Sequence, residues 1–133
     1  MKKADYIYAI GRRRSSAARV RLFKGKGENI VNDKPFEKYF KGEVSKNLIA
    51  KPFGVTETSD KYYFTARILG GGVNGQLDAL ILALSRALLK VSPEKFRPQL
   101  RKLNLLSRDS RVRQRRMVGT GGKARREKQS PKR

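Results

Sequence analysis

The side chains that carry most metal and acid–base chemistry are absent from this chain. Its 133 residues include no histidine and no cysteine. Imidazole and thiolate metal sites, disulfides and His-based catalytic triads are therefore excluded. The carboxylates of Asp60, Asp78 and Glu94 are scattered along the sequence and form no pair suited to general acid–base work. We expect a protein that is not an enzyme, with no metal site and no cofactor.

One glycine-rich segment, residues 70–75, has the spacing of a phosphate-binding loop. The sequence Gly-Gly-Gly-Val-Asn-Gly fits G-x-G-x-x-G and lies between an expected strand and an expected helix. A dinucleotide site also needs an acid at the end of a second parallel strand, whereas Glu94 follows a Ser-Pro helix start. The glycines are first expected to allow a sharp turn and close helix packing. In a second interpretation, the backbone at Gly71 and Gly72 contacts an RNA phosphate.

Arginine and lysine are the residues with an obvious chemistry here, because the formal net charge is +22. Such a charge points to a polyanionic partner. Seven basic residues and no acid lie between residues 12 and 26. Guanidinium groups bind phosphate bidentately, and serine hydroxyls add neutral donors. We expect a phosphate-binding ridge, at a hairpin tip and along one strand face, formed by Arg12, Arg13, Arg14, Ser15, Arg19, Arg21, Lys24 and Lys26.

The C-terminal part of the chain is a second basic region. Residues 101–133 carry a net charge of +11, equal to that of the first hundred residues. From residue 107 onward, too few apolar side chains are present to offset the loss of chain entropy on folding. We therefore expect a globular domain over 1–105 and an extended basic tail over 106–133 that orders on RNA. Its expected RNA contacts are Arg108, Arg111, Arg113, Arg115, Arg116, Lys123, Arg125 and Arg126.

Strands and helices must position these residues, and their expected order along the sequence predicts an α/β (α+β) two-layer sandwich. A mostly antiparallel, four-stranded sheet would pack against one long helix, with strands over 6–10, 17–23, 28–31 and 61–69. In the second strand, apolar residues alternate with Arg19 and Arg21, which predicts an outer arginine face.

Helices are expected over 35–40, 43–51 and 76–91, with a last one opening at Ser92-Pro93. Asn32 and Asp33 should cap the first of these helices. Ser92 should cap the last, and Pro98 should kink or shorten it. The alternating aromatics are expected mainly in the core or half-exposed on the sheet, with base stacking as the second interpretation: Tyr6, Tyr8, Tyr62, Tyr63 and Phe64.

Taken in order, these motifs resemble those of one family. The segment GRRRSSAARVRL at 11–22, the glycine motif at 70–76 and the SRALL helix segment at 85–89 carry the resemblance, together with the Lys-Ala-Arg-Arg of the tail and the closing Lys-Arg. The sequence resembles the family of protein nine of the small ribosomal subunit, in its bacterial form, over nearly the whole chain.

The resemblance implies an α/β fold with a left-handed β-α-β crossover and a structural role. The protein would bind small-subunit ribosomal RNA in the subunit head, beside neighbouring head proteins. Its tail would reach the anticodon stem-loop of the peptidyl-site tRNA through Lys128, Lys132 and Arg133. Residues 127–131 read Glu-Lys-Gln-Ser-Pro where that family usually has Ala-Pro-Gln-Phe-Ser. This difference puts the contacts just before the terminus in question.

Charge alone leaves other classes open. The main alternative is a general DNA- or RNA-compacting basic protein, followed by a dinucleotide-dependent enzyme and a membrane-active peptide. The apolar segment 77–91 is interrupted by charged residues and is too short to span a bilayer. We expect no membrane partner and no small-molecule substrate. The expected location is the cytoplasmic ribosome, with an organelle ribosome as the alternative.

Overall fold

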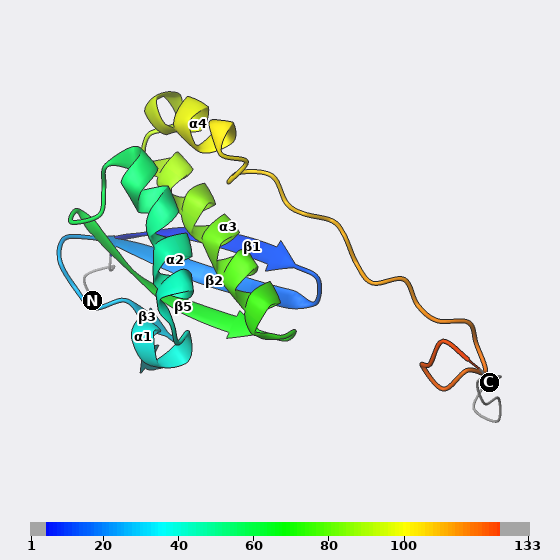
Figure 1. The fold of residues 1–133 in the computed structure, drawn as a ribbon. Coiled ribbons are helices and arrows are strands. Elements are labelled where there is room, and N and C mark those ends of the chain that lie inside the picture. The colour runs from blue at the N-terminus through cyan, green and yellow to red at the C-terminus, as the bar shows by residue number, and fades with distance from the viewer. Residues whose placement is uncertain (1–4, 126–133) are drawn as a thin grey trace.

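A mixed β-sheet with helices on one face forms the body of the chain (Figure 1). The computed structural model describes residues 5–125. Within that range the strands are β1 (Tyr6–Arg13), β2 (Ser16–Lys24), β3 (Ile30–Val31), β4 (Lys34–Pro35) and β5 (Tyr62–Leu69). The helices are α1 (Phe36–Tyr39), α2 (Glu43–Thr56), α3 (Val73–Val91) and α4 (Pro93–Lys102).

The sheet has the strand order β1-β2-β5-β3-β4. The β1/β2, β2/β5 and β3/β4 pairs are antiparallel, whereas β3 and β5 run parallel. Since α1 and α2 lie between β3 and β5 in the sequence, these two strands form a β-α-β unit. The left hand expected for that connection stays a prediction. The described sheet has five strands, whereas four were expected; the additional strand is the short β4.

Asn32 and Asp33 form a turn between two strands, and the expected helix cap was wrong. Both residues adopt left-handed backbone conformations, with φ of 49° and 66°. Such values suit a two-residue hairpin turn, for which Asn and Asp are favoured. The Asn32 side chain then continues the ladder, because its Nδ2 donates to Ile68 O at 2.9 Å and its Oδ1 accepts from Ile68 N at 2.8 Å. Helix α1 therefore begins without a side-chain cap.

Helices α2 and α3 differ from their expected bounds, whereas α4 begins at Pro93 as expected. Helix α2 continues to Thr56 through Pro52, whose buried ring offsets the hydrogen bond that proline cannot make. Helix α3 begins at Val73, three residues before the expected start. Helix α4 extends over ten residues despite Pro98, and the Ser92 side chain makes no cap hydrogen bond. Burial of Phe96 and Leu100 anchors α4 in place of a cap.

Helix α3 lies very close to the sheet because the side chains where they meet are small. A Cβ added at Gly11 of β1 would lie 2.1 Å from Ala79 O and 2.5 Å from Ala83 N. Ala79, Ala83 and Ala87 are fully buried, which confirms the expected close approach of this helix. Two basic side chains of α3 also cover the free edge of β1. Arg86 Nη1 donates to Ile10 O at 2.9 Å, and Lys90 Nζ donates to Tyr8 O.

Candidate nucleic-acid interface

The β1–β2 hairpin presents the first basic cluster. Arg13 pairs with Ser16, so Arg14 and Ser15 form a two-residue turn. Arg14 has a φ of 53°, and both turn residues are exposed. This geometry confirms that the hairpin tip holds Arg14 and Ser15, with Arg12 exposed on the adjoining strand.

Alternation along β2 places Arg19 and Arg21 outward, as expected. Val20 and Leu22 are buried between and beside them. In the antiparallel register, Arg19 lies opposite Arg67 of β5. Arg67 is not among the predicted contacts, although the same alternation along residues 62–69 places it on the outer face.

Lys24 and Lys26 lie away from the hairpin tip. Lys24 ends β2, and Lys26 follows in the loop, and both are exposed. At about 3.4 Å per residue, the eight steps from Ser16 to Lys24 separate the two ends of β2 by about 27 Å. The expected ridge is therefore a face of the sheet with a basic group at each end, and its members do not share one ligand.

Arg13 lies apart from its neighbours because it faces the helices. It is only 7% exposed, on the same side of β1 as Ala9 and Gly11. Its Nη1 lies 2.9 Å from an Asp109 carboxylate oxygen, and its Nε lies 3.6 Å from Asp78 Oδ2. Nη1 also donates to the backbone oxygens of Asp109 and Arg111, at 3.3 and 3.1 Å. These contacts occupy the Arg13 guanidinium with the protein's own oxygens.

The start of the tail is thus bound to the folded body through Asp109. The Arg111 side chain donates to both Asp109 carboxylate oxygens, with Nη2 at 2.7 Å from Oδ2. These hydrogen bonds, together with the backbone N–H of Arg111 and the charge of Arg13, hold the pKa of Asp109 well below its usual range. The same pairing raises the pKa of Arg111.

The glycine segment forms a turn packed against the hairpin. Gly70 and Gly71 have φ of 79° and 67°, and a Cβ on Gly71 would lie 2.0 Å from Ser16 Oγ. Ser16 Oγ and Gln76 Nε2 each donate to Gly70 O at 3.0 Å. These contacts support the expected role of the glycines in close packing. They also place the exposed Gly71 and Gly72 beside the hairpin tip, at the start of α3.

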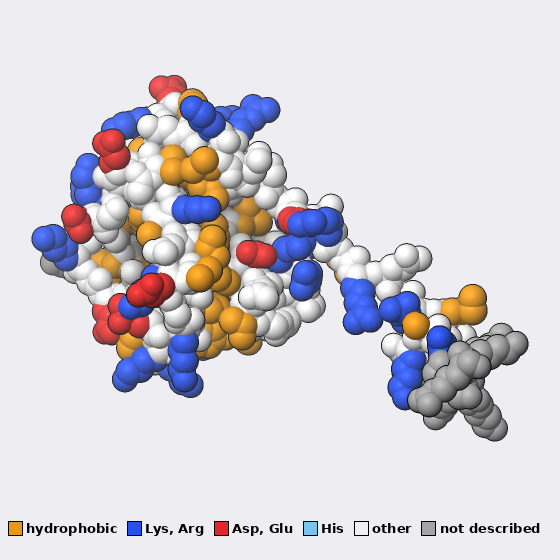
Figure 2. Space-filling view, viewed as in Figure 1, with side chains coloured by type: hydrophobic (Ala, Val, Ile, Leu, Met, Phe, Trp, Pro, Cys, Tyr) orange, Lys and Arg blue, Asp and Glu red, His pale blue; other side chains and the backbone are white. Residues whose placement is uncertain are grey.

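The described part of the tail, residues 106–125, runs away from the body without helix or strand (Figure 1). Lys and Arg side chains follow it in Figure 2, whereas acidic side chains lie over the body and at the start of the tail. The basic residues beyond the Asp109 contact are exposed: Arg113, Arg115, Arg116, Lys123 and Arg125. Arg108 and Arg111 are also exposed.

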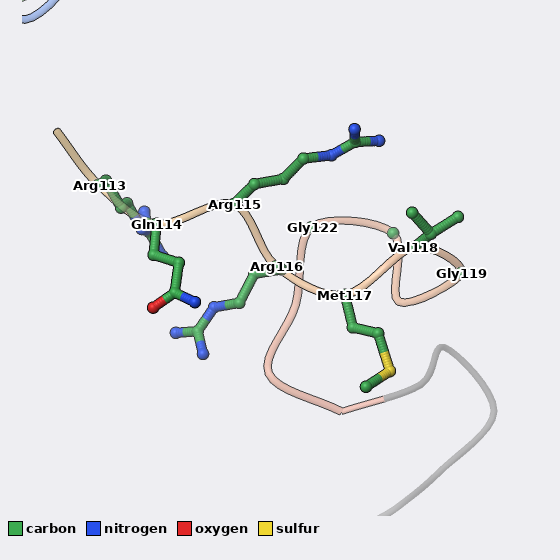
Figure 3. Close-up of a pocket in the computed structure, with 9 residues that line it drawn as sticks. Arg113, Gln114, Arg115, Arg116, Met117, Val118, Gly119 and Gly122 are labelled. Carbon is green, nitrogen blue, oxygen red and sulfur yellow. The ribbon is translucent and has the colours of Figure 1, made fainter.

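A loop closes the described tail. Thr120 Oγ1 donates to Met117 O at 2.8 Å, and Gly119, Gly121 and Gly122 have positive φ. Figure 3 shows the Arg115 and Arg116 side chains pointing away from one another. The two guanidinium groups therefore face different directions and suit separate phosphates. Four predicted contacts lie outside the described residues: Arg126, Lys128, Lys132 and Arg133.

Residues 5–125 contain neither a metal-binding cluster nor a membrane-spanning helix. No group of three or more acidic side chains in that range could hold a metal ion. None of the described helices is both long enough and apolar enough to cross a membrane.

Comparison with known proteins decides the family. The sequence model described as ribosomal protein S9/S16 matches residues 11–133. The chain belongs to this ribosomal protein family. Membership confirms the expected resemblance and the structural, non-enzymatic role, and it removes the dinucleotide-dependent enzyme suggested by the glycine motif.

Individual members of the family are similar along most of the chain. The small ribosomal subunit protein uS9 of Leifsonia xyli is 44% identical over 125 residues, which cover 94% of this chain and 74% of the relative. The uS9 protein of Rickettsia canadensis is 42% identical over 130 residues, or 98% of this chain and 80% of the relative. The uS9 protein of Cutibacterium acnes is 42% identical over 111 residues, which cover 84% of this chain but only 64% of the relative.

Proposed function

We propose that this protein is a structural component of the small ribosomal subunit that binds ribosomal RNA in the subunit head. Its relatives are named as small-subunit proteins. The observation that carries the proposal is the separation of its charge into two exposed basic surfaces, one on the folded body and one along the tail. The folded domain over 1–105 contacts RNA from outside, and the tail over 106–133 passes between RNA elements.

On the body, the contacts are made by the hairpin tip and the outer face of the sheet. Arg12, Arg14 and Ser15 bind phosphates at the tip, beside the backbone at Gly71 and Gly72. Arg19 and Arg21 bind on the sheet, and Lys24 and Lys26 bind at its far end. Arg13 is not among these proposed RNA contacts, because its guanidinium is already paired with Asp109 and Asp78.

Between residues 108 and 125, the tail contains many arginine and lysine residues but only one acidic residue, Asp109. The proposed contacts are Arg108, Arg111, Arg113, Arg115, Arg116, Lys123, Arg125 and Arg126. Binding is electrostatic, and each neutralised phosphate releases counterions. The logarithm of the affinity then falls with the logarithm of salt concentration by about 0.9 per duplex phosphate and about 0.7 per single-strand phosphate.

The length of the tail suits contact with a distant RNA. At about 3.3–3.6 Å per extended residue, the 28 residues of 106–133 reach at most about 90–100 Å. The tail tip, with Lys128, Lys132 and Arg133, contacts the anticodon stem-loop of the peptidyl-site tRNA. The protein works in the cytoplasmic ribosome among other head proteins, with an organelle ribosome as the alternative location.

Salt titration of RNA binding tests this function. The full chain is titrated with a fragment of small-subunit ribosomal RNA covering the head, and with duplex DNA of equal phosphate number, at several salt concentrations. We expect a steep salt dependence and a clear preference for the ribosomal fragment. Equal affinity for DNA and RNA would instead support a general compacting protein.

A further inference from the structure

The sheet has one face that no described helix covers. Contacts between helices and sheet are dominated by α3 on β1 and β2, and Figure 1 shows α2 and α3 on the same side of the strands. The cross-strand register sets the residues of the opposite face in rows. One row is Tyr6, Phe23 and Tyr63, and the next is Tyr8, Arg21 and Thr65. A third row is Ile10, Arg19 and Arg67.

The aromatic row is itself ordered. The Phe23 and Tyr63 rings stack with centroids 5.2 Å apart, and the Tyr6 ring lies 5.8 Å from Phe23. The Arg21 guanidinium lies 5.1 Å from the centroid of the Tyr6 ring. Tyr6 and Tyr8 are each 40% exposed, so the outer end of this face offers aromatic surface to solvent. This placement favours the second interpretation of the strand aromatics for these two tyrosines.

A hollow of about 450 Å³ lies beside the aromatic row. The hollow is lined by one tyrosine, Tyr8, and by three arginines, Arg19, Arg21 and Arg67. The volume falls within the usual range of about 300–1,000 Å³ for small ligand sites. Asp33 is the one acid of the lining; its Oδ2 lies 3.7 Å from Arg67 Nη2, with both side chains more than 70% exposed. A pair so exposed is weak, and the hollow stays positively charged.

We propose that this hollow binds an unpaired stretch of RNA, with a base stacked on Tyr8 and adjoining phosphates held by Arg19, Arg21 and Arg67. The inference rests on the proposed RNA-binding function and names the form of RNA that this face takes. Single-stranded nucleic acids bind where an aromatic ring supports a base and a basic groove follows the backbone. A duplex keeps its base faces stacked inside and gains nothing from an exposed ring. An acidic peptide would use the arginines but not the tyrosine face.

Binding of two RNA probes to the full-length chain separates these occupants. The first probe is a single-stranded oligouridylate of twelve nucleotides, and the second is a duplex RNA with the same number of phosphates. We expect Tyr8→Ala to weaken binding of the single strand by about tenfold and to leave duplex binding nearly unchanged. Unchanged duplex binding by Tyr8→Ala excludes misfolding as the cause. Tyr8→Phe keeps the ring and should bind both probes as the native chain does.

A charge-matched pair tests the arginines. Arg67→Gln should weaken single-strand binding more than Arg97→Gln, which removes an exposed charge from α4, away from the hollow. Ultraviolet crosslinking to the oligouridylate should label the peptide that contains Tyr8. The proposal is overturned if Tyr8→Ala binds the single strand like the native chain, or weakens both probes equally. It is also overturned if a polyglutamate peptide displaces the oligouridylate from the native chain and binds Tyr8→Ala less tightly.

Failure here is distinguishable from failure of the proposed function. If the Tyr8 variants behave like the native chain while ribosomal RNA still binds with a steep salt dependence, only the sheet-face proposal falls. If the native chain shows no preference for ribosomal RNA, the proposed function falls first.

Discussion

Arg13 and Asp109 lie 96 residues apart in the sequence, yet Arg13 Nη1 and Asp109 Oδ1 are 2.9 Å apart. The contact joins the β1–β2 hairpin to the start of the tail. The Arg13 side chain is 9% exposed, so its pairs with Asp109 and Asp78 are better shielded than the other ion pairs among the described residues, whose side chains are all more than a third exposed. The contact with Asp109 sets the direction in which the tail leaves the body, and it gives Arg13 a structural role within a cluster of arginines that are otherwise proposed to bind RNA.

Replacing Arg13 should release the start of the tail without removing an RNA contact. In Arg13→Gln, amide hydrogen exchange at residues 109–112 and tryptic cleavage after Arg111 should both become faster. The salt dependence of RNA binding should keep the native slope. The matched control is Arg12→Gln, which removes an exposed charge; its slope should fall by about 1 while the tail exchanges as before. If Arg13→Gln lowers the slope as much as Arg12→Gln does, Arg13 is itself a phosphate contact.

The tail contact should survive mild acid. A carboxylate whose pKa is lowered in the folded chain contributes stability above its unfolded pKa, and loses it only as pH falls through the folded value. Asp109 has an ordinary pKa of 3.8 and a lower one here, chiefly because of its hydrogen bonds with Arg111 and to a smaller extent because of the Arg13 charge. Its pairing with both arginines should therefore be intact at pH 4 and be lost well below that. The carboxyl carbon shift of Asp109, followed by NMR, measures this titration. A midpoint at the ordinary value would show that the pairing is absent in solution.

The close approach of α3 to β1 should make Gly11 intolerant of a side chain. Gly11→Ala places a methyl group within 2.5 Å of two backbone atoms of α3. Such overpacking should lower the free energy of unfolding by about 1–3 kcal/mol, measured by denaturant titration. Gly54→Ala is the control, because a Cβ there meets nothing within 4 Å and the residue lies inside α2. It should raise stability by up to about 1 kcal/mol. Equal effects of the two changes would contradict the packing described here.

The exposed tail arginines should affect RNA binding and not folding. Arg115→Gln with Arg116→Gln should reduce the salt slope by about 2, since the side chains point apart and each is proposed to bind its own phosphate. The denaturation midpoint should not move, because neither side chain is buried. If the salt slope falls by only about 1, the two arginines share one phosphate.

The tail tip is the proposed tRNA contact. Deleting Lys132 and Arg133 should leave assembly of the small subunit intact and weaken tRNA binding at the peptidyl site, measured by filter binding on purified subunits. Unchanged tRNA affinity in the shortened protein would assign the tail to ribosomal RNA alone.

Sequence patterns predicted those parts of the fold that local periodicity decides. Alternation along residues 17–23 predicted both the buried face of β2 and its outer arginines. The run of leucine and alanine after the glycines predicted α3 and its packing on the sheet. Both patterns repeat often enough for one interpretation to dominate.

What the patterns missed depends on contacts between distant segments. The inward position of Arg13 follows from the β1 register and from its contact with Asp109, which is distant in the sequence. Strand β4 has two residues, one of them proline, so it forms only because β3 is its neighbour. The early start of α3 includes Gly75, whose poor helix propensity is overridden by packing near Ser16.

Sucrose-gradient sedimentation of a cell extract tests the central claim most directly. The protein is followed through the gradient by immunoblot, under salt conditions that keep the subunits intact and separate. We predict that nearly all of it travels with the small ribosomal subunit. A protein found mainly in the free soluble fractions, or with the nucleoid, would contradict a structural role in that subunit.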